Sequence, residues 1–361
     1  MPGWISVAMP LALAGQARNT SIATGRLPET GRKAGEWQMQ VMSVTGPVDE
    51  ADLGWVLVHE HITIDMPGQE LDPSYAPDIP EIVARSVDQL QKLRELGVGA
   101  IVDPCPIELG RDPELYAEVS EKSGVKIVFA TGFYMEALGI PYYWRARDAD
   151  EIAEFYLSEI INGVGTNGLK PGVIKAATGL EASPLERRVL AGAARAQAQG
   201  GVAIITHTEN SRHGDVQQAI FAENGADPSR VMIGHQDEQK SAAPIAALAA
   251  NGTFVGIDRI GLDSLASDDH RADMVAELIQ GGHRDKVCLS QDCVCNSKAA
   301  KVPFALSSGA KITVGQFLAN MKPMTHVLTV FADKLRERGV TEEDLDVIFR
   351  DNPRRLLTGA S

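Results

Sequence analysis

The sequence of 361 residues predicts an α/β protein built on one closed (β/α)₈ barrel of the TIM type. From Val41 onward, short β-branched apolar runs alternate with longer segments of helical period. Eight such runs occur, each apolar throughout, which is typical of parallel strands covered by helices. Eight units in roughly 250 residues favour a closed barrel over an open doubly wound sheet. No GxGxxG follows the first run, so the best sign of an open dinucleotide-binding sheet is missing.

The expected elements follow in chain order. The predicted strands are Trp55–His59, Gly99–Asp103, Lys126–Thr131, Gly172–Ala176, Val202–His207, Arg230–His235, Thr253–Asp258 and Lys286–Asp292. The amphipathic stretches between them are Ile79–Leu96, Asp112–Ser123, Ala149–Ile161, Ser183–Gln199, Asp215–Glu223 and Ala242–Asn251. A short hairpin over the barrel bottom is expected at Val44–Leu53, and closing helices at Thr325–Arg338, Glu342–Arg350 and Pro353–Leu357.

Charge and cysteine content narrow the class of protein. The formal net charge is −14 and no long Lys/Arg run reverses it, which argues against nucleic-acid or anionic-membrane partners. The four cysteines, Cys105, Cys288, Cys293 and Cys295, show no paired CxxC spacing. A zinc ribbon or a disulfide scaffold is therefore not expected, and reduced thiols in a cytoplasmic protein are the simplest interpretation.

Residues 1–38 differ from the rest of the chain. The apolar stretch Trp4–Gly15 is too short to span a bilayer, and no basic segment precedes it, since the first arginine is Arg18. The remainder is rich in Gly, Ser, Thr, Ala and Arg without periodicity. We interpret residues 1–38 as a disordered leader, or as a start set too far upstream of Met39 or Met42, and residues 39–361 as a single barrel domain.

The first strand ends in His59-Glu60-His61. Side chains alternate along a strand, so both histidines are expected on one face and Glu60 on the other. Two imidazoles at the C-terminal end of a barrel strand are placed to bind one metal ion. HxH alone is a weak signal.

The fourth strand carries Lys175 in an otherwise apolar run. A lysine buried in a barrel costs several kcal/mol unless it is neutralised or paired. One interpretation is that Lys175 leans outward with its charge in water. The other is a carbamate, formed with CO₂, which would be an anion able to bridge two metal ions. This strand by itself favours the first.

Three further polar residues end later strands: His207, His235 and Asp292. Singly, each histidine is more often structural, and Asp292 could cap a helix instead. Together with His59, His61 and Lys175, however, they form six residues that converge on one mouth of the barrel. Imidazole and carboxylate ligands suit Zn²⁺ or another first-row divalent ion, and six ligands are enough for two ions.

These residues, in this order, resemble the phosphotriesterase family of the amidohydrolase superfamily. The matching motifs are Val56–Ile62 (VLVHEHI), Gly172–Thr178 (GVIKAAT), Thr206–Thr208 (THT), Ile233–Asp237 (IGHQD), Leu289–Asp292 (LSQD) and Asn352–Leu356 (NPRRL). The resemblance covers about residues 41–358. It implies two divalent ions at the C-terminal face of the strands, with a carboxylated Lys175 and a hydroxide between them. His59, His61 and Asp292 would hold the more buried ion, and His207 and His235 the more exposed one.

Within that family the sequence looks closest to the phosphotriesterase-like lactonases. Gly256–Asp263 (GIDRIGLD) resembles their DRxGLD loop, and Thr131–Tyr134 (TGFY) matches a strand end where they keep a tyrosine. Two features depart from the pattern: Glu136 stands where a second aromatic is frequent, and Cys293–Ser297 lacks the tryptophan common in their substrate loop.

The resemblance and the site chemistry together suggest functional roles. Asp292 would move the proton from the nucleophile to the leaving alkoxide. Tyr134 would hydrogen-bond the substrate or the hydroxide, or would only plug the barrel. Arg259 would anchor the substrate, or would only organise the loop after the seventh strand.

Three functions remain open from the sequence. The first is hydrolysis of lactone rings, including N-acyl-homoserine lactones, by the bridging hydroxide. The second is organophosphate triester hydrolysis, and the third is a non-catalytic binding protein stabilised by its metals. A small-molecule substrate, a homodimer, and zinc, manganese, cobalt or iron as the metal are expected.

Overall fold

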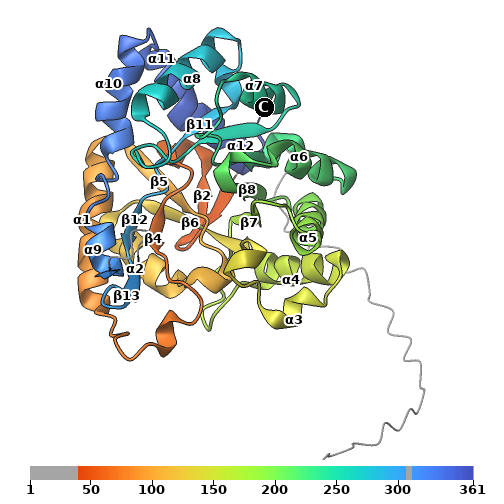
Figure 1. The fold of residues 1–361 in the computed structure, drawn as a ribbon, viewed down its shortest axis with the longest axis vertical. Coiled ribbons are helices and arrows are strands. Elements are labelled where there is room, and N and C mark those ends of the chain that lie inside the picture. Colours follow the sequence, from red (N-terminus) through yellow and green to blue (C-terminus); the bar gives the residue numbers. More distant parts are fainter. Residues whose placement is uncertain (1–39, 306–310, 361) are drawn as a thin grey trace, which may run out of the picture. The chain divides into compact units, whose positions relative to one another are not determined.

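Eight parallel strands form one sheet in the computed structural model, which describes residues 40–305 and 311–360 (Figure 1). In chain order they are β3 (Trp55–Leu57), β5 (Val98–Asp103), β6 (Lys126–Gly132), β7 (Val173–Thr178), β8 (Ala203–Thr208), β9 (Val231–Ile233), β10 (Phe254–Ile257) and β11 (Val287–Leu289). Each overlaps a predicted strand, and successive strands are hydrogen-bonded neighbours from β3 through β11. The predicted (β/α)₈ class is confirmed.

The first and last strands are joined at the C-terminal mouth. β4 (His61–Thr63) continues β3, β12 (Val294–Asn296) continues β11, and these two extensions pair in parallel with Val294 opposite His61. Below them, the His59 N–H donates to Ser290 Oγ (3.0 Å) and the Asp292 N–H donates to the His59 carbonyl (3.0 Å). Barrel closure therefore takes place among the residues predicted to bind metal.

The helices between the strands agree with the predicted stretches. They are α1 (Ile79–Glu95), α2 (Pro113–Ser123), α4 (Ala149–Asn162), α5 (Pro184–Gly200), α6 (Gly214–Glu223) and α7 (Ala243–Ala250). Side-chain oxygens cap four of them, as for Ser183, which accepts from the Glu186 N–H while Pro184 occupies the first turn. α8 (Asp268–Gln280), between β10 and β11, was absent from the predicted ranges. Its inner face includes the buried Arg271, so its apolar periodicity is weak.

Shorter elements complete the described chain. They are α3 (Tyr142–Arg145), β13 (Pro303–Ala305), β14 (Lys311–Thr313), α9 (Val314–Leu318), α10 (Val330–Glu337), α11 (Glu342–Asp346), α12 (Asn352–Thr358), the single-turn helices η1 (Glu50–Asp52), η2 (Gln69–Leu71), η3 (Ile107–Leu109), η4 (Glu136–Leu138), η5 (Glu209–Ser211), η6 (Pro228–Arg230), η7 (Arg284–Lys286) and η8 (His326–Leu328), and the π-helical turn η9 (Val347–Asp351). The closing helices were predicted near these positions.

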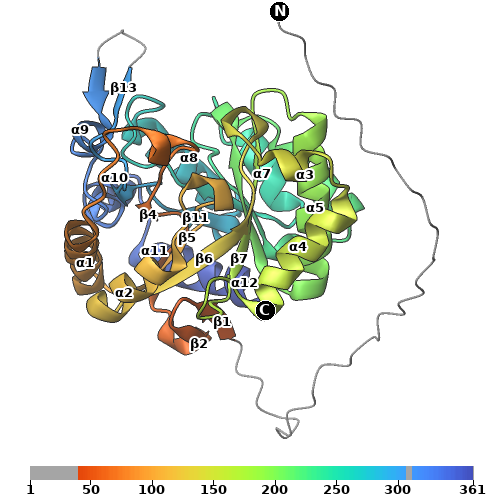
Figure 2. The same cartoon turned by 90° about the horizontal axis from the view of Figure 1, so that it is seen from below.

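The predicted bottom hairpin begins earlier than expected. Its strands are β1 (Gln40–Ser43) and β2 (Gly46–Asp49), so the turn falls where a strand was expected to start. The Val44 N–H donates to the Ile127 carbonyl at the start of β6 (2.9 Å), which places the hairpin at the N-terminal end of the strands. Figure 2 shows it at the end of the barrel opposite to β13.

Alternate residues of the strands fill two cores. Val56, Val102, Val173 and Ile205 belong to a buried cluster inside the barrel, and their neighbours in sequence pack outward against the helices. All four cysteines are buried and free, as predicted. In the part of the chain that the structure describes, no helix has the length and hydrophobicity to span a bilayer. The leader predicted for residues 1–38 lies outside the described residues.

Candidate metal centre

Six side chains predicted as metal ligands come from the barrel strands or the turns beyond them; Lys175 stands in the middle of β7, and the other five stand at or beyond the C-terminal ends of strands. The six are His59, His61, Lys175, His207, His235 and Asp292. Five of them are buried, and the side chain of Asp292 is 15% exposed. Their convergence on one mouth, expected from parallel strands, is therefore present in the structure.

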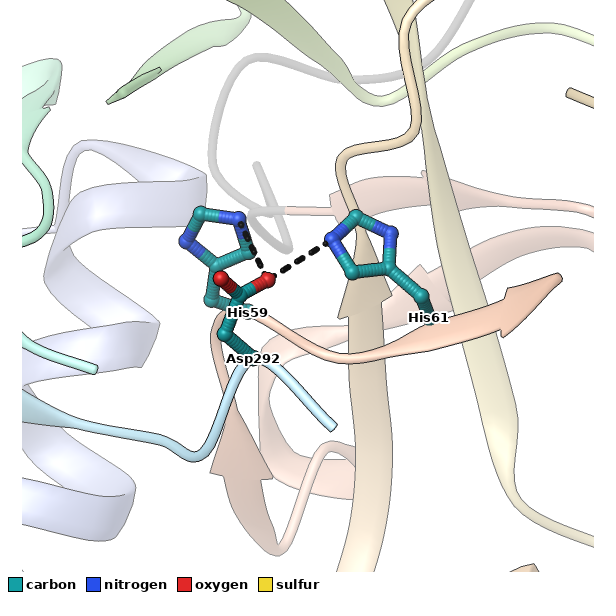
Figure 3. Close-up of side chains that lie close together, drawn as sticks. All are labelled: His59, His61 and Asp292. Carbon is teal, nitrogen blue, oxygen red and sulfur yellow. Dashed lines mark ion pairs between the residues drawn. The ribbon is translucent and has the colours of Figure 1, made fainter. Parts of the chain in front are cut away.

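The carboxylate of Asp292 lies close to the rings of His59 and His61 (Figure 3), and the ring of His235 is also near it. Its Oδ1 is 3.1 Å from His61 Nε2 and 3.7 Å from His59 Nε2. Its Oδ2 is 3.7 Å from His235 Nε2. Three ring nitrogens and one carboxylate thus face a common point, which is a suitable donor set for a first-row divalent ion.

The route by which His59 and His61 reach this point differs from the prediction. A continuous strand was expected, but β3 ends at Leu57 and β4 begins at His61. Val56 and Val58 both belong to the inner core, so strict alternation would turn His59 outward. The bend at Val58–His59 reverses this, and the two rings lie 5.4 Å apart between centroids.

Glu60 points away from the imidazoles, as expected. Its carboxylate accepts hydrogen bonds from Ser290 Oγ (2.9 Å), the Gln291 N–H (2.8 Å) and the Cys293 N–H (2.9 Å). Glu60 is fully buried. It therefore ties the bend to the segment that carries Asp292.

Two of the six residues occupy left-handed backbone. His235 lies two residues after β9 with φ 55°, and Asp292 lies three residues after β11 with φ 53°. Non-glycine residues rarely adopt this region, and such strain concentrates at functional sites. The predicted strands ended on these residues, whereas the structure places both in the turns that follow.

Buried carboxylates orient three of the histidines. Asp258 receives His59 Nδ1 at 2.8 Å on one oxygen and His235 Nδ1 at 2.9 Å on the other. Asp103 lies 3.2 Å from His61 Nδ1. In each case Nδ1 is engaged and Nε2 faces Asp292, an arrangement frequent behind metal-binding histidines.

Sequence reasoning did not single out Asp258 or Asp103, although both end predicted strands. Glycine makes room for Asp258: a Cβ on Gly234 would lie 3.0 Å from Asp258 Oδ2, and one on Gly256 would lie 2.8 Å from it. The sequence signal that could have identified Asp258 is an acidic residue at the end of a predicted strand, with glycines at Gly234 and Gly256 to make room for it.

Burial and these partners control protonation. Burial lowers the pKa of His59 and of His235, so both rings are neutral at pH 7 with a free lone pair. Burial acts the same way on His61, but hydrogen bonds to Asp103 and Asp292 raise its pKa well above the usual value. Burial alone would raise the pKa of Asp292, but the neighbouring histidines and Arg259 hold it well below its usual range.

Lys175 faces into the barrel, two residues after the inner-core Val173. It is 2% exposed, and its Nζ lies 3.0 Å from His59 Nε2. Burial lowers the pKa of Lys175 to about 8. The outward-leaning alternative is therefore wrong.

The ring of His207 packs beside the ring of His235, with their centroids 4.6 Å apart. Its Nδ1 is 3.0 Å from the Tyr134 hydroxyl and its Nε2 is 2.9 Å from Glu209 Oε2. Burial lowers the pKa of His207 to about 4, so this ring is also neutral.

Ligand atoms of His59, His61 and Asp292 all lie within 4.8 Å of one another, as do those of His59, His235 and Asp258. A third such group, His61, Asp103 and Cys105, lies behind His61. Among residues 40–305 and 311–360, His207 belongs to none of these groups. The half of the site predicted for the more exposed ion is thus the less assembled one.

Comparison with known proteins identifies the family in which this site occurs. The sequence model of the phosphotriesterase family matches residues 39–357, nearly the whole described chain. The chain belongs to the phosphotriesterase family. Membership makes it a metal-dependent ester hydrolase, so the predicted family is confirmed and the non-catalytic alternative is set aside.

Relatives and solved structures agree with this membership. A phosphotriesterase homology protein of Mycobacterium tuberculosis is 34% identical over 342 residues, covering 88% of this chain and 97% of the relative. The aryldialkylphosphatase of Saccharolobus solfataricus is 29% identical, over 86% of this chain and 97% of that protein. The organophosphorus hydrolase from Deinococcus radiodurans superposes with a TM-score of 0.80 at 32% identity, covering 89% of this chain and 97% of that one. A mutant described as a phosphotriesterase-like lactonase from the same organism gives 0.80 at 33%, covering 88% and 99%.

In this family member, Arg259 and Tyr134 both lie at the site. Arg259 Nε is 3.2 Å from Asp292 Oδ2, and its Nη1 is 3.5 Å from Glu238 Oε1. Tyr134 contacts His207 through its hydroxyl, as described above. Both side chains are largely buried. Each is placed to meet a substrate, and each is also placed to support a neighbouring side chain.

The loop after β10 is held by a buried ion-pair network. Arg271 Nε is 2.9 Å from Asp237 Oδ1, and Asp237 also accepts the N–H groups of Asp258 and Arg259 (both 3.1 Å). Arg271 also donates to the carbonyl of Leu262 within that loop (3.1 Å). This network positions Arg259 beside Asp292.

Proposed function

We propose that this chain hydrolyses lactones, with organophosphate triesters as a slower side activity. The observation that carries the proposal is a cavity of about 470 Å³ that reaches Glu209, whose carboxylate lies 2.9 Å from His207 Nε2. Its lining includes Met135 and Ala137 from the segment after Tyr134, Leu180 after β7, and Glu209 after β8. A lactone carries one side chain and needs one such pocket, whereas a triester presents three substituents. Structural neighbours described as lactonases support the same choice.

The donor set fits the family's two metal ions. His59, His61 and Asp292 would hold one ion, His207 and His235 the other, and Lys175 as its carbamate would stand between them. Among the described residues, the buried amine has one hydrogen-bonding neighbour, an imidazole, and no carboxylate in direct contact, which suits a carbamate better than an ammonium. Bound there, two divalent cations, zinc or else manganese, cobalt or iron, would activate a water and polarise the ester oxygen.

Asp292 is the proton carrier in this proposal. Held as a carboxylate at neutral pH, it can accept a proton from the attacking water and return it to the leaving alkoxide. Arg259 holds Oδ2 of Asp292, which leaves Oδ1 toward His61. From Arg259 the polar contacts continue to Glu238, near the protein surface.

Tyr134 acts as a hydrogen-bond donor. Burial raises its pKa far above the usual range, so the hydroxyl keeps its proton at any working pH. It points at His207 Nδ1, and once that nitrogen binds elsewhere the hydroxyl is free to donate to substrate.

A matched substrate panel tests the proposed activity. Metal-loaded protein would be assayed with γ-lactones and N-acyl-homoserine lactones of increasing chain length and with dialkyl aryl phosphates. We expect kcat/KM for the best lactone to exceed that for the best triester by about 100-fold, roughly 2.8 kcal/mol of barrier. Faster hydrolysis of triesters would make them the main substrates in place of lactones. No turnover of either class would contradict the proposed function.

Lys175 has its own test. Lys175→Ala should lose activity and metal, and short carboxylic acids should restore part of both by standing in for the carbamate. Lys240→Ala, an exposed lysine, serves as the control. Metal retained without rescue would show that Lys175 does not bridge the ions.

The remaining expectations concern assembly and location. We propose a homodimer in a reducing, cytoplasmic setting, supported by the four free buried thiols and by the exposed Leu71, Tyr142 and Tyr143. Light scattering during gel filtration would report the dimer, and a monomer mass at micromolar concentration would contradict it.

A further inference from the structure

Each histidine of the site has one ring nitrogen engaged by a carboxylate that is not among the six predicted ligands, but His207 differs in which nitrogen is engaged. For His59, His61 and His235 the carboxylate meets Nδ1. For His207 it is Glu209, and it meets Nε2 at 2.9 Å. The nitrogen left for a metal is therefore Nε2 in three rings and Nδ1 in the fourth.

We propose that Glu209 is a positioning residue that makes His207 bind metal through Nδ1 and sets how tightly the exposed ion is held. The inference rests on the proposed metal centre and adds a residue to it. Glu209 acts through His207 and touches neither ion itself.

Two neighbours of the ring agree on one tautomer. The Tyr134 hydroxyl lies 3.0 Å from Nδ1 and 3.5 Å from Nε2, so it can donate to the nearer nitrogen, which requires a lone pair on Nδ1. The proton of the neutral ring is then on Nε2, where Glu209 accepts it. Without that acceptor, the two tautomers become closer in energy and the ring is free to turn.

Glu209 is more exposed to solvent than Asp258 and Asp103, the carboxylates that orient the other three histidines. Asp258 and Asp103 are 0% exposed, whereas the side chain of Glu209 is 30% exposed and lines the 470 Å³ cavity. Glu209 begins the single-turn helix η5, in which Asn210 and Ser211 have positive φ. Its hold on His207 competes with water, so the exposed ion depends on a weaker support than the buried one.

Chelator-driven metal release tests the proposal in the metal-loaded protein. Wild type should release two ions in two phases. Glu209→Ala and Glu209→Leu should release the weaker ion about 10- to 100-fold faster and leave the tighter ion unchanged. Glu209→Gln keeps an oxygen acceptor for Nε2 and should stay within a few-fold of wild type.

Glu181→Gln is the matched control, because Glu181 lines the same cavity but does not contact His207. Its two release phases should match wild type. A long-range ¹H–¹⁵N spectrum of the metal-free protein should show the Nε2–H tautomer of His207 in wild type and a mixture in Glu209→Ala. The ring ¹⁵N signals of His207 would be assigned as those that disappear in a variant lacking this histidine.

Two release results would overturn the inference. Unchanged release in both Glu209→Ala and Glu209→Leu would mean that Glu209 does not act through His207. Equal acceleration in Glu181→Gln would assign the effect to cavity charge. If wild type held no metal, the proposed function would fail as well. If it held two ions without hydrolysing lactones, only the proposed substrate would fail.

Discussion

Asp292 connects the two halves of the candidate centre. Its left-handed backbone aims one carboxylate oxygen at His61 and the other at Arg259. It is the only carboxylate among the six predicted ligands, and its side chain keeps some contact with solvent. A metal-binding role and a proton-carrying role are thus combined in one side chain.

Replacing Asp292 by asparagine removes the basic oxygen with little change of shape. We expect Asp292→Asn to lower kcat for the best lactone by about 10²- to 10⁴-fold, since general acid–base catalysis contributes on that scale. Steady-state kinetics together with metal analysis would measure it. Asp285→Asn, on η7 near the start of β11, should behave as wild type. Activity within a few-fold of wild type would show that Asp292 carries no proton.

The break between β3 and β4 is the element on which the site depends. It turns His59 inward, and Glu60 ties it to the turn before β12. Three donors from the last strand segment converge on this one carboxylate. Barrel closure and metal-site assembly therefore share the same hydrogen bonds.

Removing that carboxylate should unlink the two ends of the barrel. Glu60→Ala leaves three buried donors without their acceptor, at about 1–3 kcal/mol each, so we expect at least 3 kcal/mol of lost stability. Urea unfolding of the metal-free protein would measure the change. Glu70→Ala, on the exposed η2, should change stability by less than about 0.5 kcal/mol. A small effect of Glu60→Ala would mean that closure rests on the β4–β12 ladder and the hydrogen bonds of the His59 backbone.

The short helix η3 supports the strand end that carries Tyr134. Its Glu108 accepts the Tyr134 N–H at 2.7 Å through Oε1, while Oε2 is buried with no hydrogen-bond partner in the described part of the chain. Burial raises the pKa of Glu108 from 4.5 to about 7, although the Tyr134 N–H acts in the opposite direction. The folded state therefore binds this proton more tightly than the unfolded chain does.

The sign of the resulting pH effect follows from linkage. The stability that proton binding contributes is complete below pH 4.5 and is lost as pH rises through about 7. Glu108→Gln does not titrate and keeps an oxygen for Tyr134, so it should gain up to about 3 kcal/mol over wild type at pH 8.5 and little at pH 5. Unfolding at both pH values tests this. Glu118→Gln, on the surface of α2, should show the same difference at both.

At the scale of the whole molecule, the candidate ligands bring distant parts of the barrel together. They come from the β3–β4 break, β7, β8 and the turns after β9 and β11. Ions bound there would cross-link strands that the chain connects only through helices. Folding and metal binding should therefore be coupled.

Metal removal should lower stability and activity together. A ligand present at 1,000 times its Kd stabilises the folded state by about 4 kcal/mol, so a chelator should lower Tm by roughly 10 °C. Calorimetry before and after dialysis would show it, and added zinc should restore both Tm and hydrolysis. An unchanged Tm with full activity in chelator would rule out the metal centre.

Much of the site could be predicted because it rests on local patterns. Eight apolar runs identified the strands. Polar residues at their C-terminal ends identified five candidate ligands, since parallel strands present those ends at one mouth, and Lys175 was identified as a charge within an apolar strand. Helix α8 was not predicted, because the charged Arg271 lies on its buried face. The bend at His59 was not predicted, because it depends on the hydrogen bond between Ser290 and Glu60, which joins the first and last strands of the barrel.

By itself, the sequence determined the barrel and the residue types at its mouth, because periodicity and strand-end position are properties of short segments. Only the tertiary structure decided how those residues are oriented. Asp258 reaches His59 across 199 residues of chain, and which ring nitrogen each carboxylate meets depends on backbone turns that no short segment specifies. The choice between Nδ1 and Nε2 at His207 is of that kind, since it is settled by contacts made after the barrel has closed.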